Sequence, residues 1–400
     1  MTSAAMAVGL RPPHPFPARM APDIAVQECA RIHRGGTVVD PMCGSGTVLR
    51  AASLRGHRAY GTDLDPLAVL MAKVWTSPIS PTELLRCGHQ LLDAAECLDP
   101  RDVWLPWIDS DPETKAFVDY WFSARQQADL RRIAARLAPM SGPVADALRL
   151  SLSRIIVTKD RGASLARDVS HSRPHRVSLS SDYCVMEGFR RSFRRLADLQ
   201  DSVLRGFVDV RLGDARDLGH LDTGLADLVV TSPPYLNGID YLRGHRLSLV
   251  WLGYRLEDLR RPRVEQVGAE RAASAADLGL AAMVLDSVRA SAEQLSGRYQ
   301  GILARYAVDL YRVMAEIARV LRPGGRAVLV VGDSSIRGVY VENSVLARNA
   351  ALHLPLEFKG MTRRDLPTMR RYLPPPGQDL RNSLSKRLRT EAILRFDRVG

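Results

Sequence analysis

The sequence is short of lysine and cysteine, and it contains no long apolar run. Only five of its 56 basic residues are lysines, so arginine carries nearly all of the positive charge. The five cysteines are odd in number and show no Cys-x-x-Cys spacing, which argues against a disulfide framework and against a zinc site. No apolar run reaches the roughly eighteen residues of a membrane span, and no signal peptide is recognisable. These absences predict a soluble, cytoplasmic protein without a metal centre.

What the sequence does contain is a globular composition with an excess of positive charge. Its 400 residues are 46% hydrophobic and 25% charged, which is enough for one large domain or two smaller ones. The net charge of +12 favours a polyanionic partner, because clustered cations gain affinity by releasing counterions from a phosphate backbone. Arginine also binds phosphate and guanine edges in a bidentate manner. A coding bias toward arginine explains its ratio to lysine equally well, so the net excess of charge is the stronger indication.

Two strand signals flank a glycine-containing loop near the start of the chain. Residues 36–55 have the pattern of a buried strand, a tight loop at 41–47 and a helix. A second strand at 57–62 ends at Asp63, and a second helix follows at 66–75. Strand, loop, helix, strand and acid in this order are typical of the start of a doubly wound α/β sheet.

The middle of the chain departs from this pattern. Residues 76–200 combine aromatic side chains with helical stretches, among them 113–137, and end in arginine-rich segments. We interpret them as an inserted helical and basic subdomain and as the candidate for target recognition. Residues 238–300 are expected to form a second helical insertion, and the sequence leaves open whether the target is read by 76–200, by 238–300 or by both.

The α/β pattern resumes after the first insertion. A strand is expected at 207–212, and a long helix at 302–321 is expected to be closed by Arg322-Pro323-Gly324-Gly325, where glycine can adopt the left-handed cap conformation. A further core strand is predicted at 326–333, and an edge strand at 392–396.

Three aspartates follow predicted strands, at the edge where ligands bind in doubly wound sheets. Asp40 ends the first strand and begins the sequence Asp-Pro-Met-Cys-Gly-Ser-Gly-Thr at 40–47. Asp63 ends the second strand, where a carboxylate can accept both ribose hydroxyls of an adenosine, and Asp214 ends a later strand. Each acid alone fits a helix cap or a solvated turn equally well, but the three together indicate a cofactor site. No third glycine completes a dinucleotide-binding fingerprint.

The tetrad Ser232-Pro233-Pro234-Tyr235 follows a strand-like run at 226–231 and is the most informative feature of the chain. Two consecutive prolines remove two backbone donors and fix φ, so a rigid turn offers carbonyl acceptors beside a hydroxyl and an aromatic face. Such a turn can hold a planar amino group.

Together, the tetrad and the sequence at 40–47 resemble the DNA methyltransferases that use S-adenosylmethionine to methylate exocyclic amino groups of bases. The resemblance implies a Rossmann-like class I methyltransferase sheet with helices on both faces and helical insertions, in a methyltransferase domain formed by 1–75 and 201–400. It assigns catalysis to Ser232, Pro233, Pro234 and Tyr235. It assigns cofactor binding to Asp40, Met42, Cys43, Gly44, Gly46, Thr47, Asp63, Asp214 and Ala215.

The resemblance also implies a mechanism. Ser232 Oγ and the Pro233 carbonyl accept the two amine hydrogens, and Tyr235 stacks on the flipped base. Transfer is then direct and depends on positioning and electrostatics. No Pro-Cys nucleophile motif of the cytosine-C5 type is present. Serine at the first tetrad position is associated in this family with cytosine-N4 and aspartate with adenine-N6, so N4-cytosine is favoured over N6-adenine.

The candidate substrate contacts each have two interpretations. Asp240 and Tyr241 follow the tetrad closely and either line the base pocket or belong to a helix cap. Arg161 and Arg173 lie in the basic stretch 159–176, which is either a DNA-contacting loop or a solvated surface. A second phosphate-binding face is expected from Arg363, Arg364, Arg370 and Arg371.

Two other functions fit parts of the sequence. An RNA methyltransferase acting on an exocyclic amine, such as guanine-N2, shares a similar cofactor loop and a Pro-Pro-Tyr turn, but no RNA-binding domain is recognisable. A non-catalytic nucleic-acid-binding module with a degenerate fold conflicts with the intact tetrad and glycine loop. The resemblance implies DNA as the partner and S-adenosylmethionine as the cofactor. It leaves open whether a restriction nuclease or another defence-system protein accompanies the enzyme.

Overall fold

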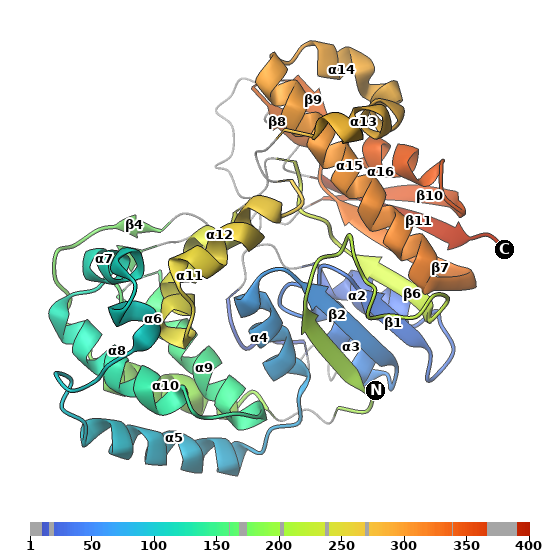
Figure 1. Cartoon of the computed structure of the whole chain (residues 1–400). Coiled ribbons are helices and arrows are strands. Elements are labelled where there is room, and N and C mark those ends of the chain that lie inside the picture. Colours follow the sequence, from blue (N-terminus) through green and yellow to red (C-terminus); the bar gives the residue numbers. More distant parts are fainter. Residues whose placement is uncertain are drawn as a thin grey trace.

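The computed structural model describes residues 10–15, 20–159, 161–167, 174–200, 204–236, 240–268, 272–337, 339–365 and 390–400. Within these residues, seven strands form one sheet in the order β5-β2-β1-β6-β7-β11-β10 (Figure 1). They are β1 (Thr37–Asp40), β2 (Arg58–Asp63), β5 (Val208–Leu212), β6 (Ala226–Thr231), β7 (Leu321–Val331), β10 (Leu356–Asp365) and β11 (Thr390–Arg398). From β5 to β7 the neighbours are parallel, whereas β11 is antiparallel to both of its neighbours.

The helices of the described residues fall into two groups, one around the sheet and one beside it. Those around the sheet are α2 (Pro22–Cys29), α3 (Thr47–Leu54), α4 (Pro66–Thr76), α13 (Leu278–Leu285), α14 (Arg289–Glu293), α15 (Gly297–Val320) and α16 (Asn343–Ala351). Those beside it are α5 (Pro81–Glu96), α6 (Pro106–Asp109), α7 (Pro112–Trp121), α8 (Ala124–Leu137), α9 (Pro143–Ile156), α10 (Val185–Ala197), α11 (Tyr241–Leu249), the 3₁₀ turn η1 (Val250–Leu252) and α12 (Leu256–Glu265). Two short hairpins pair β3 (Ala166–Arg167) with β4 (His175–Arg176) and β8 (Ser334–Ile336) with β9 (Val339–Val341).

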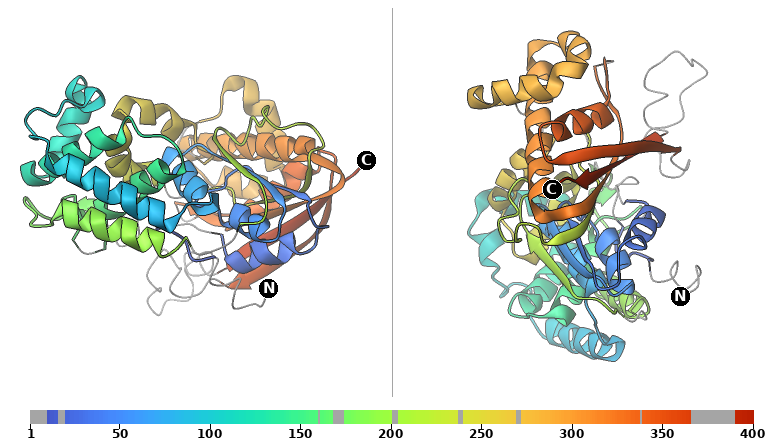
Figure 2. Two further views of the ribbon diagram at one scale, coloured as in Figure 1. Left: turned by 90° about the horizontal axis from the view of Figure 1, so that it is seen from below. Right: turned by 90° about the vertical axis from the view of Figure 1, so that its right-hand side faces the viewer.

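Helices cover both faces of the sheet because successive strand residues point to opposite sides. Val38 and Val230 pack with α2 and α3 in one hydrophobic core. Val39 and Val229 pack with α15 and α16 in another. The right-hand view of Figure 2 shows α15 and the blue helices on opposite sides of the strands. The predicted Rossmann-like α/β fold is therefore confirmed.

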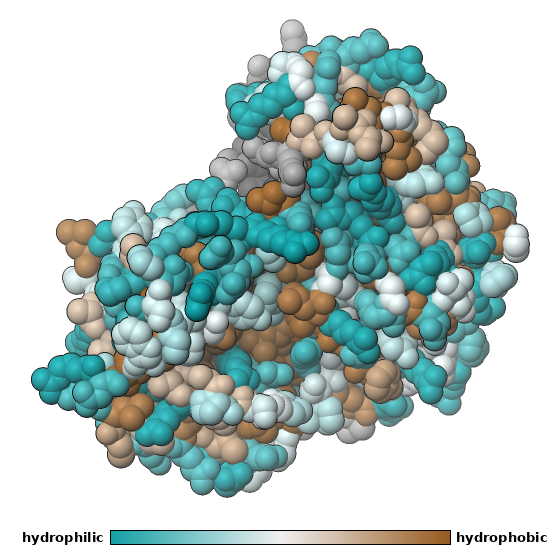
Figure 3. Space-filling view, in the orientation of Figure 1, coloured by the Kyte–Doolittle hydropathy of each residue, from teal (hydrophilic) through white to brown (hydrophobic). Residues whose placement is uncertain are grey.

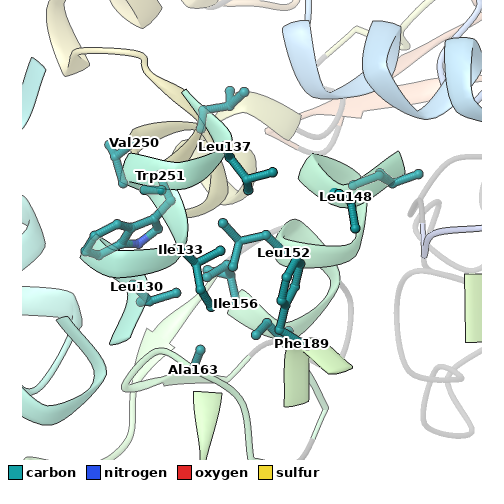
Figure 4. Close-up of a cluster of buried hydrophobic side chains, with 14 of the residues drawn as sticks. Leu130, Ile133, Leu137, Leu148, Leu152, Ile156, Ala163, Phe189, Val250 and Trp251 are labelled. Carbon is teal, nitrogen blue, oxygen red and sulfur yellow. The ribbon is translucent and has the colours of Figure 1, made fainter. Parts of the chain in front are cut away.

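The second group of helices shares a hydrophobic core of its own, and we call this group, α5 to α12, the helical lobe (Figure 1). Trp251 of η1 lies fully buried among side chains of α8 and α9, including Ile133 and Leu152 (Figure 4). Its ring meets Phe122 edge-on, with 5.1 Å between the ring centroids. The core of the helical lobe is therefore built from residues that precede β5 and residues that follow β6 in the sequence. The division of the chain into domains at 76–200 and 238–300 stays a prediction.

Helix α4 belongs to both parts of the molecule. Leu67, Leu70 and Val74 recur at the spacing of one helix face and pack into the core of the helical lobe. Val69 and Ala72, on another face, pack with the helices and strands of the sheet. A helix that is apolar nearly all round is expected to be buried, and in α4 Lys73 is the exposed exception.

Three local expectations differ from the structure. The predicted helix at 113–137 is two helices, because Phe122 is extended and buries its ring against Trp251. The predicted edge strand lies inside the sheet as β11, between β7 and β10, which explains its run of buried residues. The expected cap at Gly324 is also wrong. Helix α15 ends at Val320, and the following residue is already extended and pairs with β6, so Gly324 takes its φ of +76° within the start of β7.

No helix in the described ranges combines the length and the apolar character needed to cross a membrane. All five cysteines lie within those ranges and are free thiols. Among the residues that the structure describes, histidines, cysteines and acids do not gather in threes as metal ligands would.

Candidate active site

The candidate site lies where the strand order reverses. From β1 the chain moves outward to β2 and β5, then returns to β6 on the other side of β1 and continues to β7. The carboxyl ends of β1 and β6 therefore form the topological switch point, at which doubly wound sheets bind their ligands. Asp40 ends β1, and Ser232 directly follows β6. The parallel pairing of β2 with β1 brings Asp63 to the same edge.

The glycine loop between β1 and α3 is fixed to the end of β2. The Cys43 amide donates to the Thr62 carbonyl at 2.9 Å, and the Gly44 amide donates to Asp63 Oδ2 at 2.8 Å. Gly46 begins α3 with a φ of +86°, and a Cβ there would lie only 3.0 Å from the Ala72 backbone. Glycine is required at this position because both the conformation and the packing exclude a side chain.

Asp63, the last residue of β2, accepts two backbone hydrogen bonds. Besides the Gly44 amide it receives the Asp65 amide, on Oδ1 at 2.9 Å. Burial and the nearby charge of Asp65 raise the pKa of Asp63 to about 6. Each carboxylate oxygen keeps a second lone pair, so Asp63 can still accept hydroxyl hydrogens. This is the role that the sequence predicts for it toward a ribose.

Asp40 connects the loop to the strand that precedes the tetrad. Its Oδ1 accepts the Thr231 hydroxyl at 2.8 Å and, more weakly, the Met42 amide at 3.3 Å. Burial raises the pKa of Asp40 to about 7. Burial also raises the pKa of the Cys43 thiol well above its ordinary value, so Cys43 stays a neutral thiol packed against Gly61.

Two hydroxyls of the loop show that it fits a polar ligand. Ser45 Oγ and Thr47 Oγ1 are buried and have no hydrogen-bond partner among the described residues. Buried polar atoms are nearly always paired, so unpaired ones call for a missing partner. Together with Asp63 they fit the sugar and amino-acid portions of S-adenosylmethionine, which are rich in hydroxyl, amino and carboxylate groups.

Arg216 is a site residue that the sequence analysis missed. It binds Asp214 through its amide, at 2.9 Å, and through its guanidinium, with 2.6 Å between Arg216 Nη2 and Asp214 Oδ2. It also binds Asp309 of α15 and the Glu265 carbonyl of α12. Burial lowers the pKa of Arg216, but its bonds to the two acids outweigh this and raise it. Arg216 therefore fixes the carboxylate of Asp214, next to the buried Ala215. The only sequence signal was an arginine two residues after the acid.

The tetrad is held against the end of β7. Ser232 Oγ donates a 2.9 Å hydrogen bond to the Val330 carbonyl, and Pro233 is buried. A Cβ at Gly332 would lie 2.7 Å from the Tyr235 ring, so the ring packs directly on the Gly332 backbone. Pro234 is half-buried. The need for glycine at 332 was not evident from the sequence, because it depends on a ring about a hundred residues away.

Tyr306 of α15 is a second residue that sequence reasoning missed. It is fully buried, and both its ring and the Tyr235 carbonyl border the space beside Gly268. Burial and the nearby Tyr235 and Asp333 raise the pKa of Tyr306. Its hydroxyl has no hydrogen-bond partner within the described part of the chain.

Replacing Tyr306 by phenylalanine should therefore leave stability unchanged or raise it slightly. Removal of a buried, unpaired hydroxyl costs no hydrogen bond and relieves a desolvation penalty. Thermal unfolding of the wild type and of Tyr306→Phe would test this. A loss of more than about 1 kcal/mol would mean that the hydroxyl has a partner in the folded protein.

The affinity for S-adenosylmethionine should fall as the pH drops through about 6. The carboxylate form of Asp63 accepts hydroxyl hydrogens, and its pKa of about 6 lies well above that of a solvent-exposed aspartate. Protonation of Asp63 should thus lower the affinity by up to about tenfold per pH unit below this point. Calorimetric titrations on both sides of this pH would measure the profile. Asp63→Asn should flatten it, and a profile that persists in this variant would assign the titration to another group.

Two of the four candidate substrate contacts, Asp240 and Arg161, form ion pairs within the protein. Asp240 caps α11 by accepting the Arg243 amide and pairs with Arg263 at 2.6 Å. Tyr241 is the half-buried first residue of that helix. Arg161 forms an exposed ion pair with Asp182, and Arg173 lies outside the described residues. Their contact with a substrate stays a prediction.

Of the four arginines predicted to form a second phosphate-binding face, the structure describes two, Arg363 and Arg364. Arg363 pairs with Asp333, and Arg364 pairs with Glu391 and with Asp23. Arg370 and Arg371 lie outside the described residues.

Comparison with known proteins supports an S-adenosylmethionine-dependent methyltransferase. Among curated proteins, the chain is 20% identical over 374 residues to the type II methyltransferase M.MvaI of Kocuria varians, across 83% of this chain and 79% of that protein. No family model matches the sequence.

Solved structures give weaker likenesses. Geranyl diphosphate C-methyltransferase from Streptomyces coelicolor, in complex with S-adenosyl-L-homocysteine, is 10% identical with a TM-score of 0.35, over 94% of this chain and 79% of that one. The rRNA methyltransferase AviRa from Streptomyces viridochromogenes is 13% identical with a TM-score of 0.32, over 99% and 93%.

Proposed function

We propose that the protein is a site-specific DNA methyltransferase that methylates an exocyclic base amine, with N4-cytosine favoured over N6-adenine. The observation that carries the proposal is the hydrogen bond from Ser232 Oγ to the Val330 carbonyl. A hydroxyl has one hydrogen and two acceptor positions. Because its hydrogen is already committed to Val330, Ser232 meets an incoming amine as an acceptor.

The tetrad then prepares the amine for attack. An exocyclic amine is a poor nucleophile because its lone pair is delocalised into the base ring. When Ser232 Oγ and the Pro233 carbonyl accept its two hydrogens, the nitrogen gains sp³ character and its lone pair becomes available. The bound cofactor supplies an electrophilic methyl group on its sulfonium. The protein then positions the amine against this methyl group, and such orientation lowers a reaction barrier by several kcal/mol.

Tyr235 suits the capture of a flipped base. Its ring is packed on one side against Gly332, which leaves no space for a side chain there. A rigid aromatic face is what an extruded base stacks on. Asp40, joined to the tetrad through Thr231, adds a carboxyl with a pKa of about 7 beside the site.

DNA is the polymer favoured by charge and by similarity. The net charge of +12 suits a phosphate backbone. Helix α12 carries Arg260, Arg261 and Arg263 at the surface, where they pair with Glu113, Glu265 and Asp240, and hydrophilic side chains run along this helix in Figure 3. The similarity to a type II methyltransferase supports DNA further. On this proposal the helical lobe, which continues from the tetrad through α11, reads the target. A companion nuclease or other defence protein stays a prediction.

Nucleoside mass spectrometry tests the proposal. Purified protein is incubated with S-adenosylmethionine and either DNA or RNA, and a Ser232→Ala, Tyr235→Ala double variant serves as control. N4-methylcytosine in DNA that disappears in the double variant is the expected result. N6-methyladenine in DNA would leave the proposed mechanism in place and change the target base to adenine. Methylated RNA without methylated DNA would make RNA the substrate. Transfer to neither polymer by a protein that binds S-adenosylmethionine would contradict the proposal.

A further inference from the structure

A buried hydrogen bond between a histidine and an aspartate joins the helical lobe to the cofactor side of the molecule. His245 of α11 and Asp65, the residue that caps α4, meet with 2.5 Å between Nδ1 and Oδ2. Their side chains are 8% and 4% exposed, although the residues lie 180 positions apart in the sequence. Neither residue was singled out by its sequence context, because a histidine inside an amphipathic helix gives no sign of its partner.

Asp65 continues this contact to the proposed cofactor acid. Its other oxygen, Oδ1, accepts the Leu67 amide at 2.9 Å and so begins α4. Its own amide donates to Asp63 Oδ1 at 2.9 Å. Asp63 in turn holds the Gly44 amide of the glycine loop. A continuous series of hydrogen bonds therefore runs from α11 to the atoms expected to meet the ribose.

On its other side, the series reaches the segment that follows the tetrad. Helix α11 begins at Tyr241, six residues after Tyr235, and His245 lies one turn into it. The same helix is tied to α9 by a longer hydrogen bond, 3.4 Å from Ser248 Oγ to the Ser153 carbonyl. Helix α11 thus contacts both the cofactor side, through His245, and α9, through Ser248.

Packing alone does not account for the pair. Leu242 and Leu247 of α11, and Leu67 and Leu70 of α4, already provide apolar contacts in the shared core. Burial of an imidazole and a carboxylate removes both from water at a cost in free energy, so such a pair often adds no more stability than apolar residues of the same size. The pair instead restricts the orientation of α11 relative to α4, because the imidazole and the carboxylate meet in only a narrow range of geometries.

We propose that His245 is a positioning residue that couples cofactor binding at Asp63 to the placement of α11 and of the tetrad before it. The proposal rests on the proposed function only in taking the tetrad as the place where the target base is held. Because coupling between two sites is reciprocal, cofactor binding should order α11, and loss of the pair should weaken cofactor binding.

The first test measures affinity for S-adenosylmethionine by calorimetry, with no nucleic acid present. The variants are His245→Gln, Asp65→Asn and the double substitution. Asp65→Asn keeps a good helix cap for α4 while removing the charge. Each single variant should weaken binding by roughly 5- to 50-fold. The double variant should be no weaker than the worse single variant, because residues that act through one contact are not additive.

The second test follows hydrogen exchange in residues 241–249 with and without S-adenosylmethionine. In the wild type the cofactor should slow exchange in this helix, and in the two single variants that protection should be lost. Ser248→Ala is the matched control, since it removes a buried hydrogen bond from the same helix but has no connection to Asp63. It should keep both the affinity and the protection.

Three results would overturn the coupling. Folded His245→Gln and Asp65→Asn proteins with wild-type affinity would do so, as would wild-type protection of 241–249 in both. An equal loss in Ser248→Ala would show that any loosening of α11 has the same effect. If His245→Gln does not fold, Asp65→Asn decides the question. Failure of the wild type to bind S-adenosylmethionine would instead contradict the cofactor assignment, and failure to methylate DNA would leave this result unaffected.

Discussion

Replacing Ser232 by alanine is expected to slow methyl transfer by about 100- to 1,000-fold, with a change of no more than about twofold in the affinity for S-adenosylmethionine. The variant loses one of the two acceptors that draw the amine hydrogens out of conjugation. Loss of one preorganised polar group at a reacting centre has effects of this size in other enzymes. Single-turnover kinetics with saturating DNA would measure the transfer step, and calorimetry would measure cofactor binding.

Ser53 provides a matched control for this substitution. Like Ser232, it donates its hydroxyl to a backbone carbonyl, that of Gly206, at 3.3 Å. It is fully buried on α3, in the turn of that helix away from the glycine loop. Ser53→Ala should cost about 1 kcal/mol of stability, as expected for one neutral hydrogen bond, and leave the transfer rate unchanged. Equal losses of activity in the two variants would count against a catalytic role for Ser232.

Replacing Trp251 by alanine should destabilise the protein by about 3–5 kcal/mol, which is a large part of the stability of a typical domain. The ring is 1% exposed and fills the centre of the helical lobe between α8, α9 and Phe122. Truncation leaves a cavity that the rigid surrounding helices can close only in part. Chemical denaturation followed by circular dichroism would measure the loss.

Trp104 is the natural comparison for Trp251. It belongs to the same lobe but is 64% exposed. Trp104→Ala should change stability by no more than about 0.5 kcal/mol, as surface substitutions usually do. If Trp251→Ala proved equally mild, the helical lobe would be less tightly packed than the structure indicates.

Local signals in the sequence were enough to predict the framework of the site. The strand, loop and helix at 36–55 and the acid at 63 depend on neighbours within a few turns, and the structure has them as β1, α3 and the end of β2. The apolar period also located α15. These elements follow from hydrophobic alternation and glycine placement, which are properties of short windows.

The parts that sequence reasoning missed depend on contacts between distant segments. Arg216, Gly332 and His245 acquire their roles from residues between roughly 50 and 180 positions away. The break at Phe122 is in part of the same kind, because its ring packs against a tryptophan that lies far along the chain. No window of neighbouring residues contains these partners.

Helix α4 has a consequence for how this molecule unfolds and evolves. Its two apolar faces belong to different cores, so loosening either core exposes a buried face of the same helix. The two parts should therefore melt as one cooperative unit, and the cofactor should raise the melting temperature of both. A lobe transplanted from a relative with another sequence preference would have to reproduce the stripe formed by Leu67, Leu70 and Val74. If the lobe reads the target as proposed, exchange of specificity by recombination is restricted to lobes that already match this one helix.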